Sequence, residues 1–387
     1  MISMRLTDFV WFQRGFDLPQ SKFEEGDIPV FGSTSILGYH NIAKVKAPGI
    51  ITGRSGTLGK FQYAETDFWP HNTTLWVKDF KGSDPKFAYY LLQCLDFTVF
   101  NSGGAVPSLN RNLLNAYIVN VPPLKTQKKI ASILSGYDDL IENNLKRIKI
   151  LEEMAQQTYE EWFVRMRFPG HESATINSET GLPEGWEKKK INDVADFSNG
   201  YAFYTKGYSD EETCYKVIDL GNIAENSDLK ISGKEKCISE DLYLSSSKFY
   251  LNKNDIIIAM TDVTPALGIL AKSAIINASN TYVLNQRVGR IRCEKEIDYS
   301  YVYAILNDRR FIERMKSLTK GAVQFYFNTK DICNYEFVIP DNEILKKFVS
   351  IYQPFLVLRD SLKAQNQRLR EARDILLPRL MMGMIEV

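Results

Sequence analysis

The residue types that most often carry catalysis are sparse in this chain, and their spacing matches no common catalytic motif. The three histidines, His40, His71 and His171, lie far apart, and no cysteine stands near one of them at a metal-binding spacing. The sequence contains no GxxxxGKS/T phosphate loop, no HExxH pair and no GxSxG turn. We therefore expect no catalytic residue and no metal site in this chain.

Two short motifs match nucleotide or methyl-transfer chemistry only in part. Gly53, Gly56 and Gly59 recur every third residue, a spacing that differs from the dinucleotide-binding fingerprint and is more typical of turns. The segment Asn120–Pro123 is similar to the Asn-Pro-Pro-aromatic motif of amino-methyltransferases, but a valine is inserted and the aromatic residue is missing. Neither motif supports a cofactor site.

The composition is that of a folded chain with two domains. Its 387 residues are 44% hydrophobic and 25% charged, which argues against disorder, and the length exceeds one ordinary core. A net charge of +1 argues against wholesale electrostatic binding of nucleic acid. Any contact with DNA must therefore use local patches or the help of a partner.

The chain is expected to be cytoplasmic. No window offers eighteen uninterrupted apolar residues, and the N-terminal segment Met1–Arg5 is not followed by a signal-peptide apolar region. The cysteines form an odd set without a close pair, which favours reduced thiols over a disulfide framework or a zinc ribbon. They are Cys94, Cys214, Cys237, Cys293 and Cys333. We therefore expect neither a membrane span nor secretion.

The clearest sign of organisation is an internal repeat. Gly104-Ala105-Val106 returns as Gly321-Ala322-Val323 at an offset of 217 residues, and Gly15-Phe16 returns as Gly200-Tyr201 at an offset of 185. A longer series then returns at an offset of 218: Asn110, Tyr117, Val121-Pro122, Ile130, Ser132-Ile133 and Leu140 correspond to Asn328, Tyr335, Ile339-Pro340, Phe348, Ser350-Ile351 and Leu358. The ordered series predicts two copies of one scaffold, with insertions in the second copy.

Each copy is predicted to begin with a globular part of mixed structure. Short runs of β-branched residues, such as Ile50–Thr52 and Asp255–Ala259, indicate strands. Helical patterns occur near residues 85–97 and 299–316. Each globular part therefore combines strands with helices.

An amphipathic helical segment follows each globular part. Apolar residues recur there at three- and four-residue spacings, with charged residues on the other face. Gly136 and Pro354 stand at equivalent places and predict a short helix, a break and a long helix, near 137–167 and near 354–377. We expect the two long helices to pack together, although each could instead pack on its own domain. The predicted fold class is α+β, with two α/β domains related by a pseudo-twofold duplication and separated by an antiparallel coiled coil.

Asn144 and Gln365 interrupt the two apolar seams. Either they are tolerated polar residues at a wet edge, or they control the register of the helices, because a buried polar group disfavours misaligned pairings. Both interpretations stay open at the level of sequence.

Several segments resemble the specificity (S) subunits of Type I restriction-modification systems. The resemblance is carried by the central segments Phe163–Glu172 and Leu182–Trp186, by Pro122–Gln127 and by the distal segment Leu376–Gly383. It covers essentially the whole chain, including the duplicated order of parts. One departure is the end of the second globular part, Ile339–Glu343, which lacks the double proline and the glutamine.

The resemblance implies a non-catalytic subunit that reads double-stranded DNA, with each recognition domain contacting one half of a bipartite target. The helical pair would set the spacer and dock two methyltransferase (M) subunits. S-adenosylmethionine, ATP and Mg are then expected on the partner subunits, including the restriction (R) subunits, and no cofactor in this chain. The implied parts are recognition domains at 1–124 and 187–341, a central helical region at 125–168, a linker at 169–186, a distal helical region at 342–377 and a C-terminal tail at 378–387.

The predicted helix lengths give a spacing for the target. Helices of 24 to 31 residues are roughly 36–46 Å long at 1.5 Å per residue. One turn of DNA, about 10 base pairs, is roughly 34–36 Å. We therefore predict half-sites whose centres lie roughly 10 base pairs apart.

Polar residues in turn-like segments are the candidates for DNA contact, because readout needs donors and acceptors at groove edges and phosphate contacts fix the register. In the first domain they are Arg54, Ser55, Thr57, Lys60, His71, Asn72, Ser108 and Arg111. In the second they are Thr261, Asp262, Thr264, Gln286, Arg287, Lys320, Gln324 and Tyr326. For each residue the alternative is a solvated turn or a cap, and the repetition of Asn110 as Asn328 favours a scaffold turn there.

Two groups are candidates for docking the M subunits. The aromatic residues Tyr159, Trp162 and Phe163 stand at the end of the first long helix, although they could simply cap the core. Met381 and Met382 in the tail have flexible thioethers that suit an adaptable surface. Two other function classes stay open: a duplicated adaptor that binds only protein, and a stand-alone methyltransferase or nuclease with an unrecognised motif.

Overall fold

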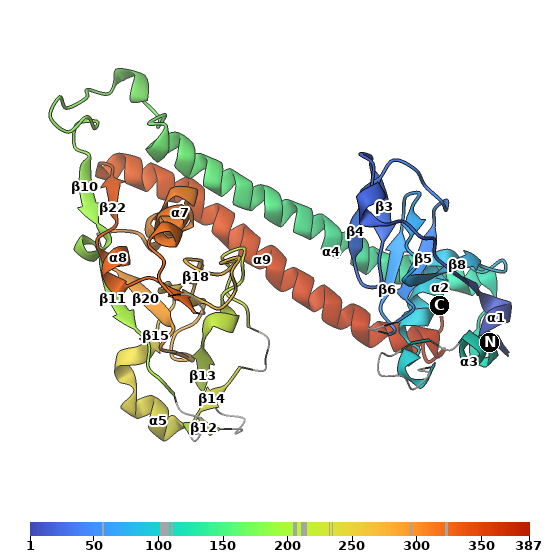
Figure 1. The fold of residues 1–387 in the computed structure, drawn as a ribbon. Coiled ribbons are helices and arrows are strands. Elements are labelled where there is room, and N and C mark those ends of the chain that lie inside the picture. Colours follow the sequence, from blue (N-terminus) through green and yellow to red (C-terminus); the bar gives the residue numbers. More distant parts are fainter. Residues whose placement is uncertain are drawn as a thin grey trace. The chain divides into compact units, whose positions relative to one another are not determined.

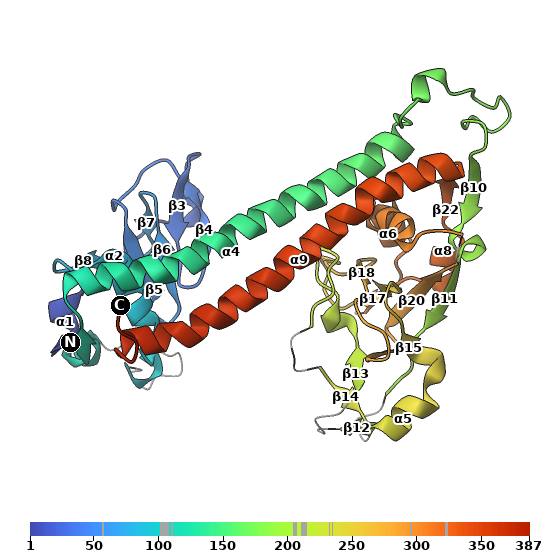
Figure 2. The same cartoon turned by 180° about the vertical axis from the view of Figure 1, so that it is seen from behind.

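The structure is a computed structural model of residues 1–387. It describes all of them except 56–57, 101–107, 110, 204–206, 210–214, 232, 234, 295 and 322–323, and except the side chains of residues 98 and 111–113. The chain divides into two compact units, drawn in Figures 1 and 2. Unit 1 comprises Met1–Lys146 and Leu362–Val387, and unit 2 comprises Arg147–Ser361.

Unit 1 is built on a four-stranded antiparallel sheet of order β2-β8-β5-β6 and a three-stranded sheet of order β4-β3-β7. Every residue of β5 is buried, as expected for a β-branched central strand. Helix α2 begins where Asp84 accepts a hydrogen bond from the backbone N–H of Phe87, with Pro85 in the first turn. The strands are β1 (Ile2–Arg5), β2 (Trp11–Arg14), β3 (Ile28–Phe31), β4 (Ile36–His40), β5 (Gly49–Gly53), β6 (Phe61–Ala64), β7 (Trp69–Pro70), β8 (Thr74–Asp79) and β9 (Ile118–Val121), and the short helices are α1 (Leu6–Phe9), α2 (Pro85–Gln93) and α3 (Arg111–Ala116).

Unit 2 contains a four-stranded sheet of order β11-β20-β16-β18 and a five-stranded sheet of order β12-β14-β13-β19-β15. Helix α6 begins at a cap in which Asp298 accepts a hydrogen bond from the N–H of Ser300. The strands are β10 (Glu187–Lys190), β11 (Ala195–Asn199), β12 (Tyr208–Ser209), β13 (Tyr215–Ile218), β14 (Cys237–Ile238), β15 (Tyr250–Leu251), β16 (Ile256–Ala259), β17 (Thr261–Asp262), β18 (Ser273–Ile275), β19 (Tyr282–Leu284), β20 (Val288–Cys293), β21 (Phe325–Tyr326) and β22 (Glu336–Ile339), and the short helices are α5 (Glu240–Ser245), α6 (Tyr299–Asn307), α7 (Arg309–Ser317) and α8 (Thr329–Cys333).

The two units repeat one topology. The order β2-β8-β5-β6 corresponds strand by strand to β11-β20-β16-β18, and β4-β3-β7 corresponds to β14-β13-β19. In each copy the second of these sheets contains one parallel pair, β3 with β7 in unit 1 and β13 with β19 in unit 2. The predicted duplication and the α+β class are therefore confirmed, and the second copy adds β12, β15, α5 and α7.

One glycine position explains part of the repeat. Gly15 and Gly200 each lie against the end of the short parallel strand of their own unit, β7 and β19. The N–H of the following residue donates to that strand, from Phe16 to the carbonyl of Pro70 and from Tyr201 to that of Leu284. A Cβ atom on Gly15 would lie 2.1 Å from the carbonyl oxygen of His71, and one on Gly200 would lie 2.1 Å from that of Asn285. Only glycine permits this approach, so the residue recurs in both copies.

Each globular part is closed by a pair of antiparallel strands, β1 with β9 and β10 with β22. A long helix follows at once: α4 (Leu124–Tyr159) in the first copy and α9 (Asn342–Met381) in the second. Gln127 ties the start of α4 to its domain by donating to the carbonyl of Pro122 and accepting from the N–H of Asp84.

The start of α9 uses a different residue. Asp341 accepts hydrogen bonds from the backbone N–H groups of Glu343 and Ile344 and from the indole N–H of Trp186. This carboxylate supplies the helix cap where the second copy lacks the double proline and the glutamine.

The predicted breaks at Gly136 and Pro354 are wrong, because α4 and α9 run through both residues (Figures 1 and 2). A glycine inside a helix costs only about 1 kcal/mol relative to alanine. Pro354 is exposed, so the carbonyl of Ser350, which loses its helical donor, can bond to water. The packing of the rest of each long helix stabilises it by more than the glycine or the proline costs.

The predicted helix ends also differ. The α-helical part of α4 ends at Tyr159 and continues as a π-helical turn, Glu160–Val164, whereas the prediction ended at residue 167. Helix α9 continues to Met381, beyond the predicted end at 377, and includes Pro378.

In unit 1 the two long helices pack antiparallel through a polar bridge. Asn144 donates through Nδ2 to Oδ1 of Asn366 at 2.9 Å and to Oε1 of Gln365 at 3.0 Å. Asn144 and Asn366 are only 4% and 1% exposed, whereas Gln365 is exposed. The buried partner is therefore Asn366, and the pairing favours the register interpretation over the wet edge.

In unit 2 the same helices enclose an aromatic core. Phe348 of α9 is fully buried, and its ring centroid lies 4.9 Å from that of Phe163 and 5.8 Å from that of Trp162. Tyr301 of α6 packs on the same cluster. Within each unit the helices thus pack both on each other and on the core of the domain.

The segment predicted as an extended linker is packed in part. It contains a short 3-10 helix, His171–Ser173, and a bridge between Ile176 and Pro183. Trp186 is buried, and its ring lies 4.6 Å from that of Phe168. Aromatic burial therefore orders a segment whose polar composition indicated a linker.

The structure bears on two expectations, the absence of a membrane-spanning helix and the presence of free thiols. Among the helices of the described residues, none has the length and apolar character needed to cross a membrane. The expectation of free thiols holds for Cys94, Cys293 and Cys333 but is wrong for Cys237, which is disulfide-bonded. Cys237 lies in β14, opposite Lys216 of β13. The spacing of the cysteines in the sequence does not reveal this strand pairing.

Candidate nucleic-acid interface

In unit 1, three turns far apart in the sequence meet beyond the ends of β5 and β8. The N–H of Arg54 donates to the carbonyl of Thr73 at 2.9 Å, and the N–H of Leu109 donates to the carbonyl of Arg54 at 3.0 Å. Ser55 and Ser108 form an antiparallel bridge. We call the turns Arg54–Ser55, His71–Thr73 and Ser108–Leu109 turn cluster 1.

The side chains of turn cluster 1 offer several hydrogen-bonding groups. Arg54 and Ser55 are half-buried, and Lys60 is exposed just before β6. His71 Nδ1 lies 3.1 Å from the hydroxyl of Thr73, and Asn72 donates to the carboxylate of Asp17. The structure thus brings the predicted residues Arg54, Ser55, His71, Asn72 and Ser108 together on one backbone frame.

Unit 2 builds the equivalent frame with different residues. The N–H of Met260 donates to the carbonyl of Arg287 at 3.2 Å, and Thr261 pairs with Tyr326. Lys320 and Tyr326 exchange two backbone hydrogen bonds, at 2.8 and 3.0 Å. We call the turns Met260–Asp262, Asn285–Arg287 and Lys320 with Phe325–Tyr326 turn cluster 2.

Turn cluster 2 is the more exposed in its predicted contact residues. Gln286, Arg287 and Lys320 are exposed, and Tyr326 is 41% exposed although it belongs to a strand. Gln324 is half-buried beside β21. The frame thus carries two cations, an amide and a phenol at its surface, which can donate to phosphates and to base edges.

Asp262 does not belong to that surface, although it was predicted to contact DNA. It is 2% exposed, and its carboxylate accepts hydrogen bonds from the N–H and hydroxyl of Thr264 and from the N–H of Ile269, at 2.8 to 3.0 Å. Burial by itself raises the pKa of this carboxyl, but the hydrogen bonds from Thr264 and from the backbone of Ile269 and Leu270 outweigh it and lower the pKa. Asp262 therefore holds the turn, and Thr264, itself exposed, is tied to it.

Two predicted contact residues cannot be placed in this way. Thr57 lies outside the described residues, and the side chain of Arg111, the first residue of α3, lies outside them too.

Two residues beside the turn clusters were missed by the sequence reasoning. Arg14 is exposed, and its Nε donates to the carbonyl of Asn72 at 3.4 Å. Tyr201 is 42% exposed, and its carbonyl accepts from the N–H of Gln286 at 3.0 Å. Arg14 directly precedes the repeated pair Gly15-Phe16, and Tyr201 belongs to the equivalent pair Gly200-Tyr201. The repeat was therefore the sequence signal that could have identified both residues.

The residues predicted to dock partners are mostly unavailable. Tyr159, Trp162 and Phe163 are buried in the aromatic core of unit 2, so the alternative that they cap the core is favoured. Met381 is buried in the core of unit 1, because α9 extends to include it. Met382 alone of this set is exposed.

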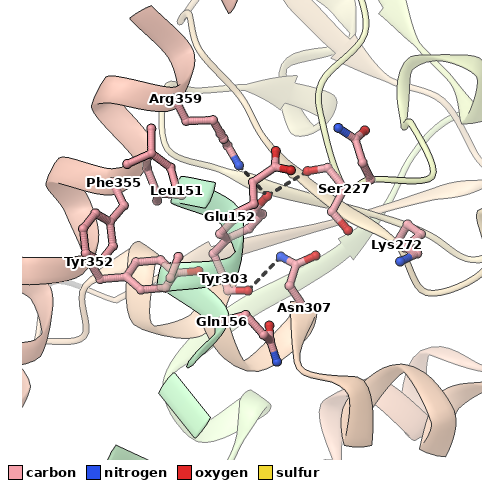
Figure 3. A pocket seen from close by; sticks show the side chains of 13 residues that line it. Leu151, Glu152, Gln156, Ser227, Lys272, Tyr303, Asn307, Tyr352, Phe355 and Arg359 are labelled. Carbon is pink, nitrogen blue, oxygen red and sulfur yellow. Dashed lines mark hydrogen bonds between the residues drawn. The ribbon is translucent and has the colours of Figure 1, made fainter. Parts of the chain in front are cut away.

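A cavity of about 240 Å³ lies in unit 2 between α4, α6 and α9. Figure 3 shows its polar side chains turned toward one another: Arg359 donates to the hydroxyl of Tyr303 at 3.3 Å, and that hydroxyl donates to the carbonyl of Ser227 at 2.7 Å. Burial lowers the pKa of Lys272 on the opposite wall. None of the predicted contact residues lines this cavity. Among the described residues, no group of three or more His, Cys, Asp or Glu side chains could hold a metal ion.

Comparison with known proteins gives consistent matches along the chain. The family model of the Type I restriction modification DNA specificity domain matches residues 2–153 and again residues 183–371. The chain is 26% identical over 319 residues to the Type I restriction enzyme MjaIX specificity subunit of Methanocaldococcus jannaschii, covering 79% of this chain and 70% of the relative. It is 23% identical over 376 residues to the Type I restriction enzyme HindI specificity subunit of Haemophilus influenzae, covering 78% and 77%.

A solved structure shares the fold. The crystal structure of the Type-I restriction-modification system S subunit from M. genitalium matches with a TM-score of 0.64 and 16% identity, over 98% of this chain and 95% of that one. At this identity the likeness supports the fold alone.

Proposed function

The chain belongs to the family of Type I restriction-modification DNA specificity subunits, and we propose that turn cluster 1 and turn cluster 2 each read one half of a bipartite target in double-stranded DNA. One observation carries the proposal. In both units an equivalent backbone hydrogen bond (Arg54 to Thr73, and Met260 to Arg287) and an equivalent antiparallel pairing (Ser55 with Ser108, and Thr261 with Tyr326) join the turns, while the side chains on those turns differ. A shared backbone that carries different side chains on its turns is what two domains need in order to recognise different DNA sequences.

The charges on the two clusters fit contact with a duplex. Arg14 and Lys60 are exposed beside turn cluster 1, and Arg287 and Lys320 are exposed on turn cluster 2. Phosphate contacts by such cations position a protein on DNA, and hydrogen bonds to base edges supply the sequence preference. With a net charge of +1 for the whole chain, we expect weak binding by the chain alone and tighter binding with its partners.

An exposed apolar stripe on each long helix supports docking of two M subunits. Residues spaced i, i+4 and i+7 lie on one face of a helix, and the stripe recurs at the offset of 218. Its outer members are 39 to 52% exposed and its central aromatic member is half-buried. The members are Ile133, Tyr137 and Leu140, called stripe 1, and Ile351, Phe355 and Leu358, called stripe 2. Two equivalent surfaces suit two copies of one partner.

We assign no catalytic step to this chain. In the proposed complex the M subunits bind S-adenosylmethionine and modify the target, and the R subunits bind ATP and Mg. The contribution of this chain is then to position the catalytic subunits at a specific DNA sequence.

The helices are the proposed determinant of the spacer. Helices α4 and α9 contain 36 and 40 residues, and each contributes to both units. We propose half-sites whose centres lie about one DNA turn, or about 10 base pairs, apart. Inserting four residues after Lys146 and after Ser361 adds about 6 Å to each helix, so the preferred spacer should grow by about two base pairs. An unchanged spacer would show that the helices do not set the distance.

The first test of the function is DNA binding. Methylation mapping in cells with and without the gene should reveal one bipartite motif that depends on it. Titration of that duplex at modest salt, with and without M subunits, should then show selective binding over a scrambled duplex. Methyl transfer by the purified chain alone would favour the stand-alone enzyme, and protein binding without DNA selectivity would favour the adaptor.

Arg54 tests turn cluster 1 directly. If its guanidinium contacts a base, Arg54→Ala should weaken binding by about 1–3 kcal/mol and relax one position of the motif. Lys78→Ala is the matched control, because Lys78 is an exposed cation near the other end of β8. A uniform loss across sequences would make Arg54 a phosphate contact.

The stripes can be tested by stoichiometry. Leu140→Ser in stripe 1 should reduce the number of bound M subunits from two toward one, and adding Leu358→Ser in stripe 2 should remove both. Leu145→Ser is the control, because Leu145 is 47% exposed on α4 but corresponds to a lysine, Lys363, in the other copy. Native mass spectrometry reads the result, and equal loss in the control would contradict the assignment.

A further inference from the structure

A short loop without charge projects from turn cluster 2. After β17 the chain passes through Val263-Thr264-Pro265-Ala266, and all of these residues are exposed. Val263 is 61% exposed, which is unusual for a branched apolar side chain. We call Val263–Ala266 the apolar loop.

The apolar loop is held at both ends. On one side the buried carboxylate of Asp262 accepts hydrogen bonds from the N–H and hydroxyl of Thr264. On the other side the same carboxylate accepts from the N–H of Ile269, and Leu267 packs on the core of unit 2. Because the hydroxyl of Thr264 is engaged at the base, the side chains of the loop present mainly carbon to their surroundings.

Two turns that carry exposed cations are connected by backbone bonds to the residues just before the loop. Arg287 is bonded through its carbonyl to the N–H of Met260, two residues before Asp262. Lys320 pairs with Tyr326, which pairs with Thr261. An uncharged tip with exposed cations on the neighbouring turns matches a duplex, in which phosphates flank a groove lined by base edges.

We propose that the apolar loop reads thymine, with Val263 in contact with the C5-methyl group in the major groove. The proposal rests on the function proposed above and adds a residue and a base to it. In the major groove the thymine methyl is the apolar group that distinguishes one base pair from the others, whereas the minor groove offers none. The cations then contact phosphates and hold the loop against the base edge.

The experiment uses the full chain with its M subunits and the mapped target duplex. Each thymine in turn is replaced by deoxyuridine, which removes only the methyl group, and dissociation constants are measured by competition. We expect about fourfold weaker binding at one or two positions of one half-site, since one buried methyl-sized group contributes about that factor. With Val263→Ala these positions should lose most of their sensitivity to deoxyuridine.

Two controls make the result specific. Leu244→Ala removes another exposed apolar side chain of unit 2, on α5, and should leave the deoxyuridine sensitivity unchanged. Deoxyuridine in the other half-site should give the same ratio in the wild type and in Val263→Ala.

Several outcomes would overturn the inference. It fails if no deoxyuridine weakens binding, if Val263→Ala keeps the sensitivity, or if neither half-site contains an A·T pair. A loop that wedges into the minor groove would lose affinity with Val263→Ala equally on thymine and deoxyuridine duplexes. If the wild type does not distinguish the mapped target from a scrambled duplex, the proposed function itself has failed.

Discussion

The two recognition domains share their backbone and differ at their tips. Sheet order, the parallel strand pair and the glycine approach recur in both, whereas Arg54 corresponds to Met260 and Ser108 to Tyr326 on the turns. The shared features are held by backbone hydrogen bonds, which tolerate many side chains. The difference teaches that the scaffold and the proposed DNA-reading surface are separable within one fold.

The helix pair shows the same division. In unit 1 the helices meet through the buried pair Asn144 and Asn366, and in unit 2 through an aromatic cluster around Phe348. Ile130 and Phe348 occupy the same place in the repeat, and both are buried. The helix contact in unit 1 therefore supplies a polar pair that can fix the register of the helices, and the contact in unit 2 supplies apolar burial.

The largest effect is expected at that shared place. Phe348→Ala removes a ring packed against three aromatic residues of α4 and its π-helical turn and should lower the free energy of unfolding by about 4 kcal/mol. Ile130→Ala in unit 1 should cost about 3 kcal/mol, because less apolar surface is removed. Urea denaturation of the full chain measures both, and a larger loss for Ile130→Ala would reverse the comparison.

The glycine approach should be equally indispensable in both copies. Gly15→Ala and Gly200→Ala each place a Cβ atom 2.1 Å from a carbonyl oxygen and should each cost about 3 kcal/mol. Gly136→Ala is the opposite case, because nothing lies within 4 Å of its Cβ position, and it should stabilise α4 by up to about 1 kcal/mol. Thermal unfolding of the three variants checks the sign of each change.

The polar bridge should separate stability from register. Asn144→Leu removes the donor to the buried Oδ1 of Asn366, whose Nδ2 still donates to the carbonyl of Ile141, and should cost about 2 kcal/mol. The double variant Asn144→Leu with Asn366→Leu should recover most of that loss but pair the helices less uniquely, which engineered cysteine crosslinks across the seam can detect. Gln365→Leu, at an exposed position, should change stability little, and a large loss there would contradict the assignment of Asn366 as the seam partner.

The smallest expected effect concerns the turn held by Asp262. Its folded pKa is lowered, so its stabilising contribution is present above the unfolded value of about 3.9 and is lost as pH falls through the folded pKa. We expect slow hydrogen exchange at the amides of Thr264 and Ile269 near neutral pH, after correction for intrinsic rates, and loss of that protection well below pH 4. Asp262→Asn should remove the pH dependence and cost about 1 kcal/mol, whereas unchanged protection at low pH would refute the role.

Much of the fold could be predicted because its signals are local or repeated. The strand at Ile50–Thr52, the helix after Asp84 and the amphipathic seams follow from residue type and period. The breaks at Gly136 and Pro354 were predicted wrongly because a local rule ignores the packing that keeps a long helix continuous. For the candidate site, the sequence indicated polar turns but not how deeply each of their side chains is buried, so the assignment of DNA contacts stays a prediction.

The sequence by itself determined the duplication, the α+β class and the family, because repeated residues and periodic apolar positions are properties of the order of amino acids. Only the tertiary structure decided which residues are buried and which reach the surface. It buried Asp262, Trp162 and Met381, exposed Val263 and Arg14, and chose Asn366 over Gln365 as the partner of Asn144. The physical reason is that burial depends on neighbours brought from distant segments, and those neighbours are fixed only when the strands and helices pack.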